Sequence, residues 1–99
     1  MAIKSMFSSA YRQLVGAVVN ARKAAGLTQR QLADRLRRPQ NFVGRVETEQ
    51  RRLDFIELLA WLKACDVDAE EAVLALAKRV GSSLTTNKGR GRTRSKKGC

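Results

Sequence analysis

Apolar residues recur every three or four positions over most of this chain, and no long stretch alternates apolar with polar residues. The three-to-four spacing is typical of helices with one buried face, whereas alternation is typical of strands. The first apolar stripe consists of Tyr11, Leu14, Val15, Val18 and Val19. It predicts a helix that is capped by Ser8 or Ser9 and runs to about Ala25. Gly26 is suited to the end of that helix.

Two short helices are expected next, because each follows a residue that favours a helix start. Thr28, with Gln31 three positions later, can form a capping box for the second helix. Pro39 suits the opening of the third helix, which is expected over residues 40–48. Neither helix is long enough to be stable alone, so both must be held by tertiary packing.

A fourth and a fifth helix are expected after Asp54 and Asp68, since an acid at a helix start both caps it and meets the positive end of its dipole. From Gly81 onward the only large apolar residue is Leu84, and basic residues alternate with Gly, Ser and Thr. Such a segment cannot build a core and is expected to be disordered. The predicted fold is all-α, with an N-terminal arm over 1–10, a five-helix domain over 11–80 and a disordered basic tail over 81–99.

Charge adds a prediction about the partner. The 99 residues include 20 Lys and Arg, 9 Asp and Glu and no His, which gives a net charge of +11. Residues 1–71 contribute 12 basic and 9 acidic side chains (+3), whereas residues 72–99 contribute 8 basic and no acidic ones (+8). A surface with this charge favours polyanions such as nucleic acids.

Targeting signals are not expected. The chain has no run of 18 apolar residues that would predict a membrane span, and its first ten residues lack the apolar stretch of a signal peptide. The two cysteines, Cys65 and Cys99, are too few for a disulfide framework. Cys65 falls in an apolar helical run, where a reduced thiol behaves as a small hydrophobe. These features favour the reducing cytoplasm, in association with the nucleoid.

Residues 28–47 have the spacing of a helix-turn-helix, in which two short helices are joined by a three-residue turn. Ala33 is small at the point where the two helices would cross closely. Leu36, Val43 and Val46 can hold the second helix of the pair against the rest of the domain. The outer face of that helix is then free to enter the major groove of DNA.

The chain resembles the phage-repressor/Cro (XRE) family of DNA-binding domains from about Tyr11 to Val67. The residues that carry the resemblance are the arginine and glycine of Arg22–Leu27, LTQRQLADRL at Leu27–Leu36, Val43, RVE at Arg45–Glu47, and RRLD at Arg51–Asp54. The resemblance implies a five-helix domain that binds double-stranded operator DNA, usually as a homodimer. It also implies that the second helix of the motif lies in the major groove.

The resemblance carries over to particular residues of the third helix. It places Gln40, Asn41, Gly44 and Arg45 on the side that faces the groove. Gln and Asn can form paired hydrogen bonds with adenine, and Arg45 suits guanine or a phosphate. Gln29 is expected to contact a phosphate and to brace Gln40. The alternative is that Gln40 and Asn41 are ordinary polar residues of an exposed helix.

Two positions depart from the family pattern, which usually has Gly where this chain has Arg37 and Glu49. Each side chain is expected on a left-handed backbone, at a cost of roughly 1 kcal/mol. Arg37 and Arg38 are expected to offset that cost by facing phosphates. Arg51 and Arg52, after the third helix, are further expected DNA contacts.

Three apolar or acidic features concern packing. Phe42 either packs between helices or touches a thymine methyl group. Glu47 is expected to be structural, because a carboxylate in the groove would repel DNA. An apolar stripe comprises Trp61, Val73, Leu76 and Val80. It exceeds what so small a domain easily covers, which favours a dimer seam, and ordinary core filling is the alternative.

The basic tail is expected to contact phosphates without sequence preference, through Lys88, Arg90, Arg92, Arg94, Lys96 and Lys97. A merely solubilising role is one alternative. RNA binding is another, since Arg with interspersed Gly also suits RNA.

Together these features predict a sequence-specific transcriptional regulator, a repressor rather than an activator, that reads a pseudo-palindromic DNA operator. One alternative is an antitoxin or controller protein of the same family that also has a protein partner. Another is an architectural protein that binds nucleic acid through its tail. No catalytic residue, metal or cofactor is expected, because the sequence has no His, no Cys pair at metal-binding spacing and no phosphate-binding glycine loop outside the tail.

Overall fold

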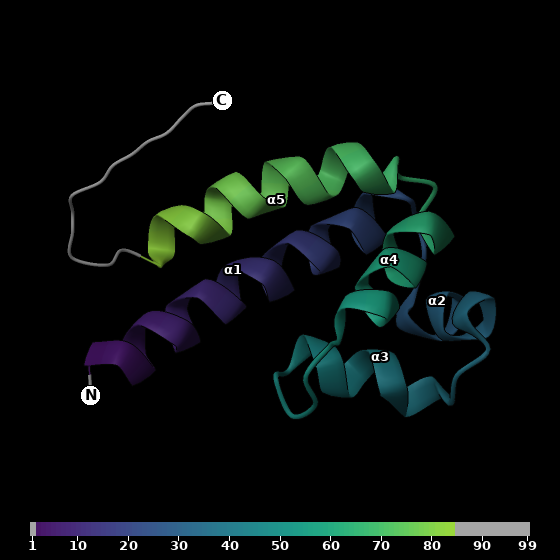
Figure 1. Ribbon diagram of the computed structural model, residues 1–99. Helices are drawn as coiled ribbons and strands as arrows, with labels where there is room; N and C mark the ends of the chain where they lie inside the picture. Colours follow the sequence, from purple (N-terminus) through teal and green to yellow (C-terminus); the bar gives the residue numbers. More distant parts are fainter. Residues whose placement is uncertain (1, 85–99) are drawn as a thin grey trace.

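Five helices form the fold, as predicted (Figure 1). The computed structural model describes residues 2–84, with side chains from Phe7 onward. The helices are α1 (Ala2–Ala24), α2 (Gln29–Leu36), α3 (Gln40–Glu47), α4 (Phe55–Ala64) and α5 (Ala69–Ser83). No strand occurs within residues 2–84, so the all-α class is confirmed for this range. No helix in the same range is both long and apolar enough to cross a bilayer.

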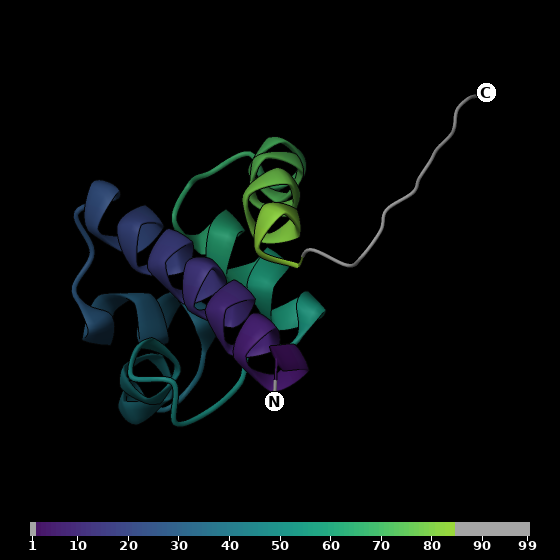
Figure 2. The ribbon, with the colours of Figure 1, turned by 90° about the vertical axis from the view of Figure 1, so that its left-hand side faces the viewer.

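The helices pack around α1. α5 runs beside α1 in the opposite direction, so the end of α5 lies next to the start of α1 (Figure 1). α2 and α3 lie together on the side of α1 away from α5, as the turned view shows (Figure 2). α4 lies between α5 and the α2–α3 pair and contacts α1, α2 and α5. This arrangement leaves α3 with one face against the domain and the other face outward.

The predicted starts of α2, α4 and α5 are confirmed by their caps. In α2 the backbone N–H of Gln31 donates to Oγ1 of Thr28 at 3.0 Å, and the backbone N–H of Thr28 donates to Oε1 of the Gln31 side chain at 2.9 Å. In α4 the Glu57 amide donates to Oδ1 of Asp54 at 2.7 Å, and the Asp54 amide donates to Oε1 of Glu57 at 3.0 Å. Asp68 caps α5 by accepting from two amides of its first turn. These caps are local interactions, which explains why sequence alone locates them.

Two predicted boundaries are wrong. α1 begins at Ala2 rather than after Ser8 or Ser9, so the segment predicted as an arm over 1–10 is helical from Ala2. At the other end, α5 continues through Gly81 to Ser83. The start of α1 and the end of α5 pack together, because Phe7 and Leu84 line one apolar groove. Packing between α1 and α5 thus overrides the weak local signals for caps and breaks.

The core forms where α1 crosses the other helices. Trp61 is fully buried and donates from Nε1 to the Val18 carbonyl at 3.0 Å. Leu76 is 8% exposed, and Val73 and Val80 pack against the same core. Trp61 and Leu76 of the predicted stripe are therefore core residues, whereas Val73 is only part-buried and also lines a groove between α4 and α5. The exposed apolar side chains of α4 and α5 are instead Phe55, Ile56 and Leu74.

The helix pair of the predicted motif is packed as its residues indicate. Ala33 of α2 and Val43 and Val46 of α3 are fully buried. Phe42 is also buried, and its ring centroid lies 6.4 Å from that of Trp61. Phe42 thus packs between helices, the first of its two predicted roles.

Candidate nucleic-acid interface

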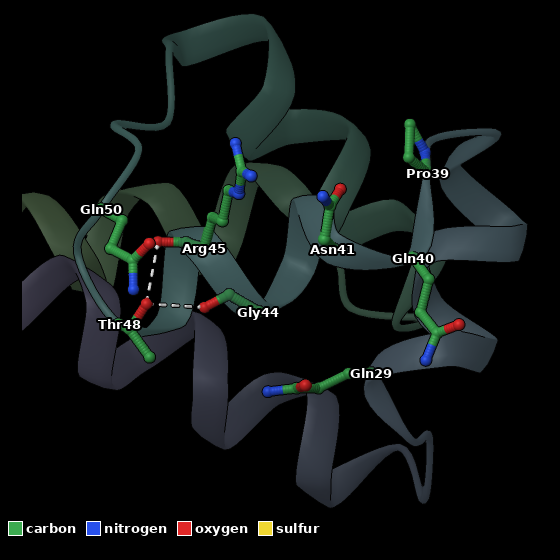
Figure 3. A pocket seen from close by; sticks show the side chains of 8 residues that line it. All are labelled: Gln29, Pro39, Gln40, Asn41, Gly44, Arg45, Thr48 and Gln50. Atoms are coloured by element: carbon green, nitrogen blue, oxygen red, sulfur yellow. Dashed lines mark hydrogen bonds between the residues drawn. The ribbon is translucent and has the colours of Figure 1, made fainter.

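The outer face of α3 borders an open hollow of about 630 Å³ (Figure 3). Six of its eight lining residues have polar side chains; the lining residues are Gln29, Pro39, Gln40, Asn41, Gly44, Arg45, Thr48 and Gln50. Five of these residues were predicted to contact DNA: Gln29, Gln40, Asn41, Gly44 and Arg45. The fold therefore brings the predicted groove-facing residues to one surface.

Helix periodicity produces this surface. Asn41 and Arg45 are one turn apart on α3, and their side chains point to the same side (Figure 3). Val43 and Val46 occupy the opposite face and are fully buried. Since residues four apart share one helix face, burial of the two valines exposes the polar residues together.

Gln29 is held beside α3 by a residue other than the one expected. Its Nε2 donates to Oε1 of Glu47 at 2.8 Å, whereas the sequence predicts a contact with Gln40. A Cβ atom at Gly44 would lie 3.5 Å from Oε1 of Gln29, which is ordinary contact. A side chain would therefore fit at position 44 without displacing α2.

Glu47 also pairs with Arg22 of α1. Arg22 donates from Nε to Oε2 of Glu47 at 2.6 Å and from Nη2 to Oε1 at 3.2 Å. The side chains of Arg22 and Glu47 are only 11% and 8% exposed. Arg22 also donates from Nη1 to the Leu27 carbonyl at 2.7 Å. The structural role predicted for Glu47 is confirmed, because its carboxylate joins α1, α2 and α3.

The turns on either side of α3 have the predicted left-handed backbone. Arg37 has φ 57° and Glu49 has φ 64°, at the two positions where the family usually has Gly. Asp66, after α4, has φ 61° and was not predicted. Each of these residues follows a helix, where a left-handed residue ends the helical hydrogen bonding.

Two of the predicted DNA contacts, Arg38 and Arg51, are paired with Glu57 of α4. Arg51 donates to both oxygens of Glu57 at 2.8 and 2.9 Å, and Arg38 donates to Oε2 at 3.1 Å. The hydrogen bonds from Arg51 hold the pKa of Glu57 below its ordinary value, and burial opposes them. The same bonds raise the pKa of Arg51. Both guanidinium carbons lie 4.8 Å from the centroid of the Phe42 ring.

Arg52 makes a different internal contact. Its guanidinium carbon lies 4.1 Å from the centroid of the Tyr11 ring. The Tyr11 hydroxyl donates to the Arg51 carbonyl at 3.4 Å and accepts from the Leu53 amide at 3.1 Å. The loop after α3 is thereby fixed to α1.

Comparison with known proteins identifies the domain. A helix-turn-helix family model, HTH_3, matches residues 19–71. A solved structure of an XRE-family like protein from Pseudomonas syringae pv. tomato str. DC3000 is 37% identical and has a TM-score of 0.72. The match covers 77% of this chain and 93% of that chain. This chain belongs to the XRE family. No curated protein sequence matches it.

As an XRE-family protein, the chain is a helix-turn-helix DNA-binding transcription regulator. α2 and α3 are the two helices of the motif, and the matched residues extend from α1 into α5. The hollow along α3 is therefore on the second helix of an XRE-family motif, which is the helix that enters the major groove in helix-turn-helix proteins.

Some residues of this XRE-family surface were missed by sequence reasoning. Pro39, Thr48 and Gln50 line the hollow, but Thr48 bonds back to the Gly44 carbonyl at 2.9 Å. Neither the apolar periodicity nor a sequence motif indicated a role for Gln50. The pairing of Glu57 was also missed, although its spacing from Asp54 marks the capping box. The six basic tail residues between 88 and 97 lie outside the described residues.

Proposed function

We propose that this XRE-family protein is a sequence-specific transcriptional repressor that inserts α3 into the major groove of a pseudo-palindromic operator. The observation that carries the proposal is the polar outer face of α3. Gln40, Asn41 and Arg45 are exposed there, and none of the internal hydrogen bonds of residues 7–84 engages their side chains. Polar groups without internal partners at a groove-facing position are available to bases.

The proposed DNA contacts are of two kinds, contacts with bases and contacts with phosphates. Gln40 and Asn41 suit adenine, and Arg45 suits guanine. Gln29, the first residue of α2, contacts a phosphate. Arg37 adds a cation in the turn before α3, where its side chain is exposed. Base contacts choose the sequence, whereas phosphate contacts fix the orientation.

The protein binds its operator as a homodimer through the α4–α5 surface. Phe55 and Leu74 are 59% and 67% exposed, and they line an apolar groove of about 570 Å³. Lys63 and Glu70 line the same groove. Because the groove holds one cation and one anion, a two-fold axis can pair Lys63 of one copy with Glu70 of the other. A second copy thus covers exposed apolar area and sets two α3 helices about 34 Å apart.

The tail strengthens binding without choosing the sequence. Its basic residues neutralise phosphates beside the operator, each adding about −0.9 to the salt slope of log K. They are Lys88, Arg90, Arg92, Arg94, Lys96 and Lys97. Repression follows when the bound dimer covers a promoter.

Selection from a random duplex library, at about 0.15 M salt and followed by footprinting, tests the proposal. The expected result is an enriched site with two inverted half-sites on one face of the duplex. Sedimentation of the free protein should show a dimer, which Leu74→Lys converts to monomer while Lys78→Gln does not. Equal affinity for all duplexes contradicts sequence-specific regulation. A complex that forms only through the tail supports the architectural alternative.

A further inference from the structure

We propose that Glu57 is a positioning residue for DNA recognition, which holds Arg38 and Arg51 against Phe42 and so withholds their charges from non-cognate phosphates. The proposal rests on the proposed DNA binding of α3. It assigns a role to an acidic residue that lies outside the reading surface.

The geometry is that of one carboxylate shared by two arginines. Arg51 donates to Oε1 and Oε2 of Glu57, and Arg38 donates to Oε2. The Glu57 side chain is 9% exposed, whereas those of Arg38 and Arg51 are 42% and 40% exposed. The carboxylate is thus screened from water, and the cations remain close to solvent. Hydrogen bonds between charged groups are stronger where the surroundings have a lower dielectric constant than water.

The shared carboxylate joins the two ends of the reading helix. Arg38 lies in the turn before α3, Arg51 lies in the loop after it, and Glu57 belongs to α4. Glu57 also accepts the Asp54 amide that caps α4. A single side chain therefore fixes both boundaries of α3 to the start of α4.

Phe42 connects this cluster to the reading residues. It directly follows Gln40 and Asn41 on α3, and its buried ring lies 4.8 Å from both guanidinium carbons. Cations over an aromatic face are attracted by the ring quadrupole. The position of the first turn of α3 thus depends on arginines that Glu57 keeps in place.

The charge balance gives the cluster its effect on DNA. Arg38 and Arg51 lie beside the helix that meets DNA, so both would find phosphates of any sequence if they were released. Such contacts raise the affinity for every duplex and add no discrimination. With Glu57 ionised, specific binding depends more on Gln40, Asn41 and Arg45.

Glu57→Gln separates this role from helix capping. A Gln at the third helical position can still accept the cap amide, as Gln31 does in α2. It cannot neutralise two arginines. Glu71→Gln is the matched control, because Glu71 is the third residue of α5 after the cap Asp68, as Glu57 is the third residue of α4 after Asp54. No salt bridge within residues 7–84 involves Glu71.

The experiment measures the affinity of the full chain for a random-sequence duplex over a range of salt concentrations. Glu57→Gln is expected to bind more tightly than the wild type, with a salt slope more negative by about 0.9 for each arginine released. Its ratio of operator to random affinity falls. Glu71→Gln leaves the slope unchanged, and adding Arg51→Gln to Glu57→Gln removes about 0.9 of the gain.

A second variant tests the same point without removing the carboxylate. Arg38→Gln, which leaves the Arg51–Glu57 pair intact, should leave the random-duplex slope of the wild type nearly unchanged, since this charge is already withheld. A slope less negative by about 0.9 would mean that Arg38 contacts a phosphate, which overturns the proposal. An unchanged slope in Glu57→Gln, with or without a lower melting temperature, overturns it as well. If the wild type binds all duplexes equally, the proposed specificity fails, but the slopes still decide the role of Glu57.

Discussion

Arg22 and Glu47 form a two-bond ion pair between α1 and the last residue of α3, with Nε to Oε2 at 2.6 Å and Nη2 to Oε1 at 3.2 Å. Both side chains are about nine-tenths buried. Gln29 donates to the same carboxylate from the first residue of α2. The charge of Glu47 is therefore compensated inside the domain, and the end of the reading helix is fixed to two other helices.

Removal of the Glu47 charge should be costly. Glu47→Gln leaves the Arg22 guanidinium buried without a counter-charge, which is expected to lower the free energy of unfolding by about 3 kcal/mol or more. Urea unfolding followed by circular dichroism measures the change. Glu49→Gln is the control, because its pair with Arg12 is long, at 3.8 Å, and exposed. That control should change stability by less than about 1 kcal/mol, and similar losses in both variants would contradict the argument.

Substitution of the reading residues should change sequence preference without changing the fold. Gln40→Ala and Asn41→Ala are each expected to cost about 1–3 kcal/mol of binding at particular base pairs. Affinities for operators with single base-pair changes locate the pairs concerned. Gln13→Ala, on the exposed side of α1, should leave every affinity unchanged. Unaltered discrimination in both α3 variants would falsify the assignment of the reading residues.

Glycine should be tolerated at the turn before α3. Arg37 has φ 57° and ψ 43°, so Arg37→Gly removes the conflict of a side chain with a left-handed backbone. The expected gain is about 1 kcal/mol in the free energy of unfolding. Gln13→Gly, at an exposed position in the middle of α1, should instead lose about 0.5–1 kcal/mol. The urea midpoints of the two variants must shift in opposite directions for the argument to hold.

Acid should weaken the contribution of Glu57. Because the pKa of Glu57 is lowered in the folded protein, chiefly by the hydrogen bonds from Arg51, its ionised form adds stability above the unfolded pKa of about 4.3. That contribution is lost as the pH falls from there through the lower folded pKa. The wild type should therefore melt at a higher temperature than Glu57→Gln at pH 7, and the difference should shrink by pH 3. A difference that stays constant over this range contradicts an ionised Glu57.

The basic tail should be removable without loss of the fold if the deletion begins after the end of α5. Deletion of residues 85–99 keeps all of α5, whereas deletion from Gly81 would remove its last turn. The shortened protein is expected to keep its operator preference and to bind every duplex more weakly. Its salt slope should be less negative by about 0.9 for each phosphate that the tail no longer neutralises. Disappearance of the preference itself would indicate an architectural role.

Much of the fold follows from local signals. The capping boxes of α2 and α4 each lie within four residues, so Thr28 with Gln31 and Asp54 mark the helix starts from sequence alone. The start of α1 could not be found in this way. Its first turns precede Ser8 and lie beside the end of α5, where Leu84 lines the same groove as Phe7 although the two are 77 residues apart in the chain.

In the candidate site, too, some features follow from local sequence and others depend on tertiary packing. The four-residue spacing of Asn41 and Arg45 predicts a common helix face, and the structure gathers both with Gln40 at one hollow. The partners of the arginines depend on tertiary packing instead. Nothing local indicates that Arg38 meets Glu57, which is 19 residues away.

Tyr11 links the dynamics of the reading surface to the longest helix. Its hydroxyl accepts the Leu53 amide and donates to the Arg51 carbonyl, while Arg52 covers its ring. The Leu53 amide is therefore shielded from solvent by a side chain of α1, 42 residues away in the chain. Its exchange with deuterium requires separation of α1 from the loop after α3, so the exchange rate of this one amide reports how often that loop leaves α1.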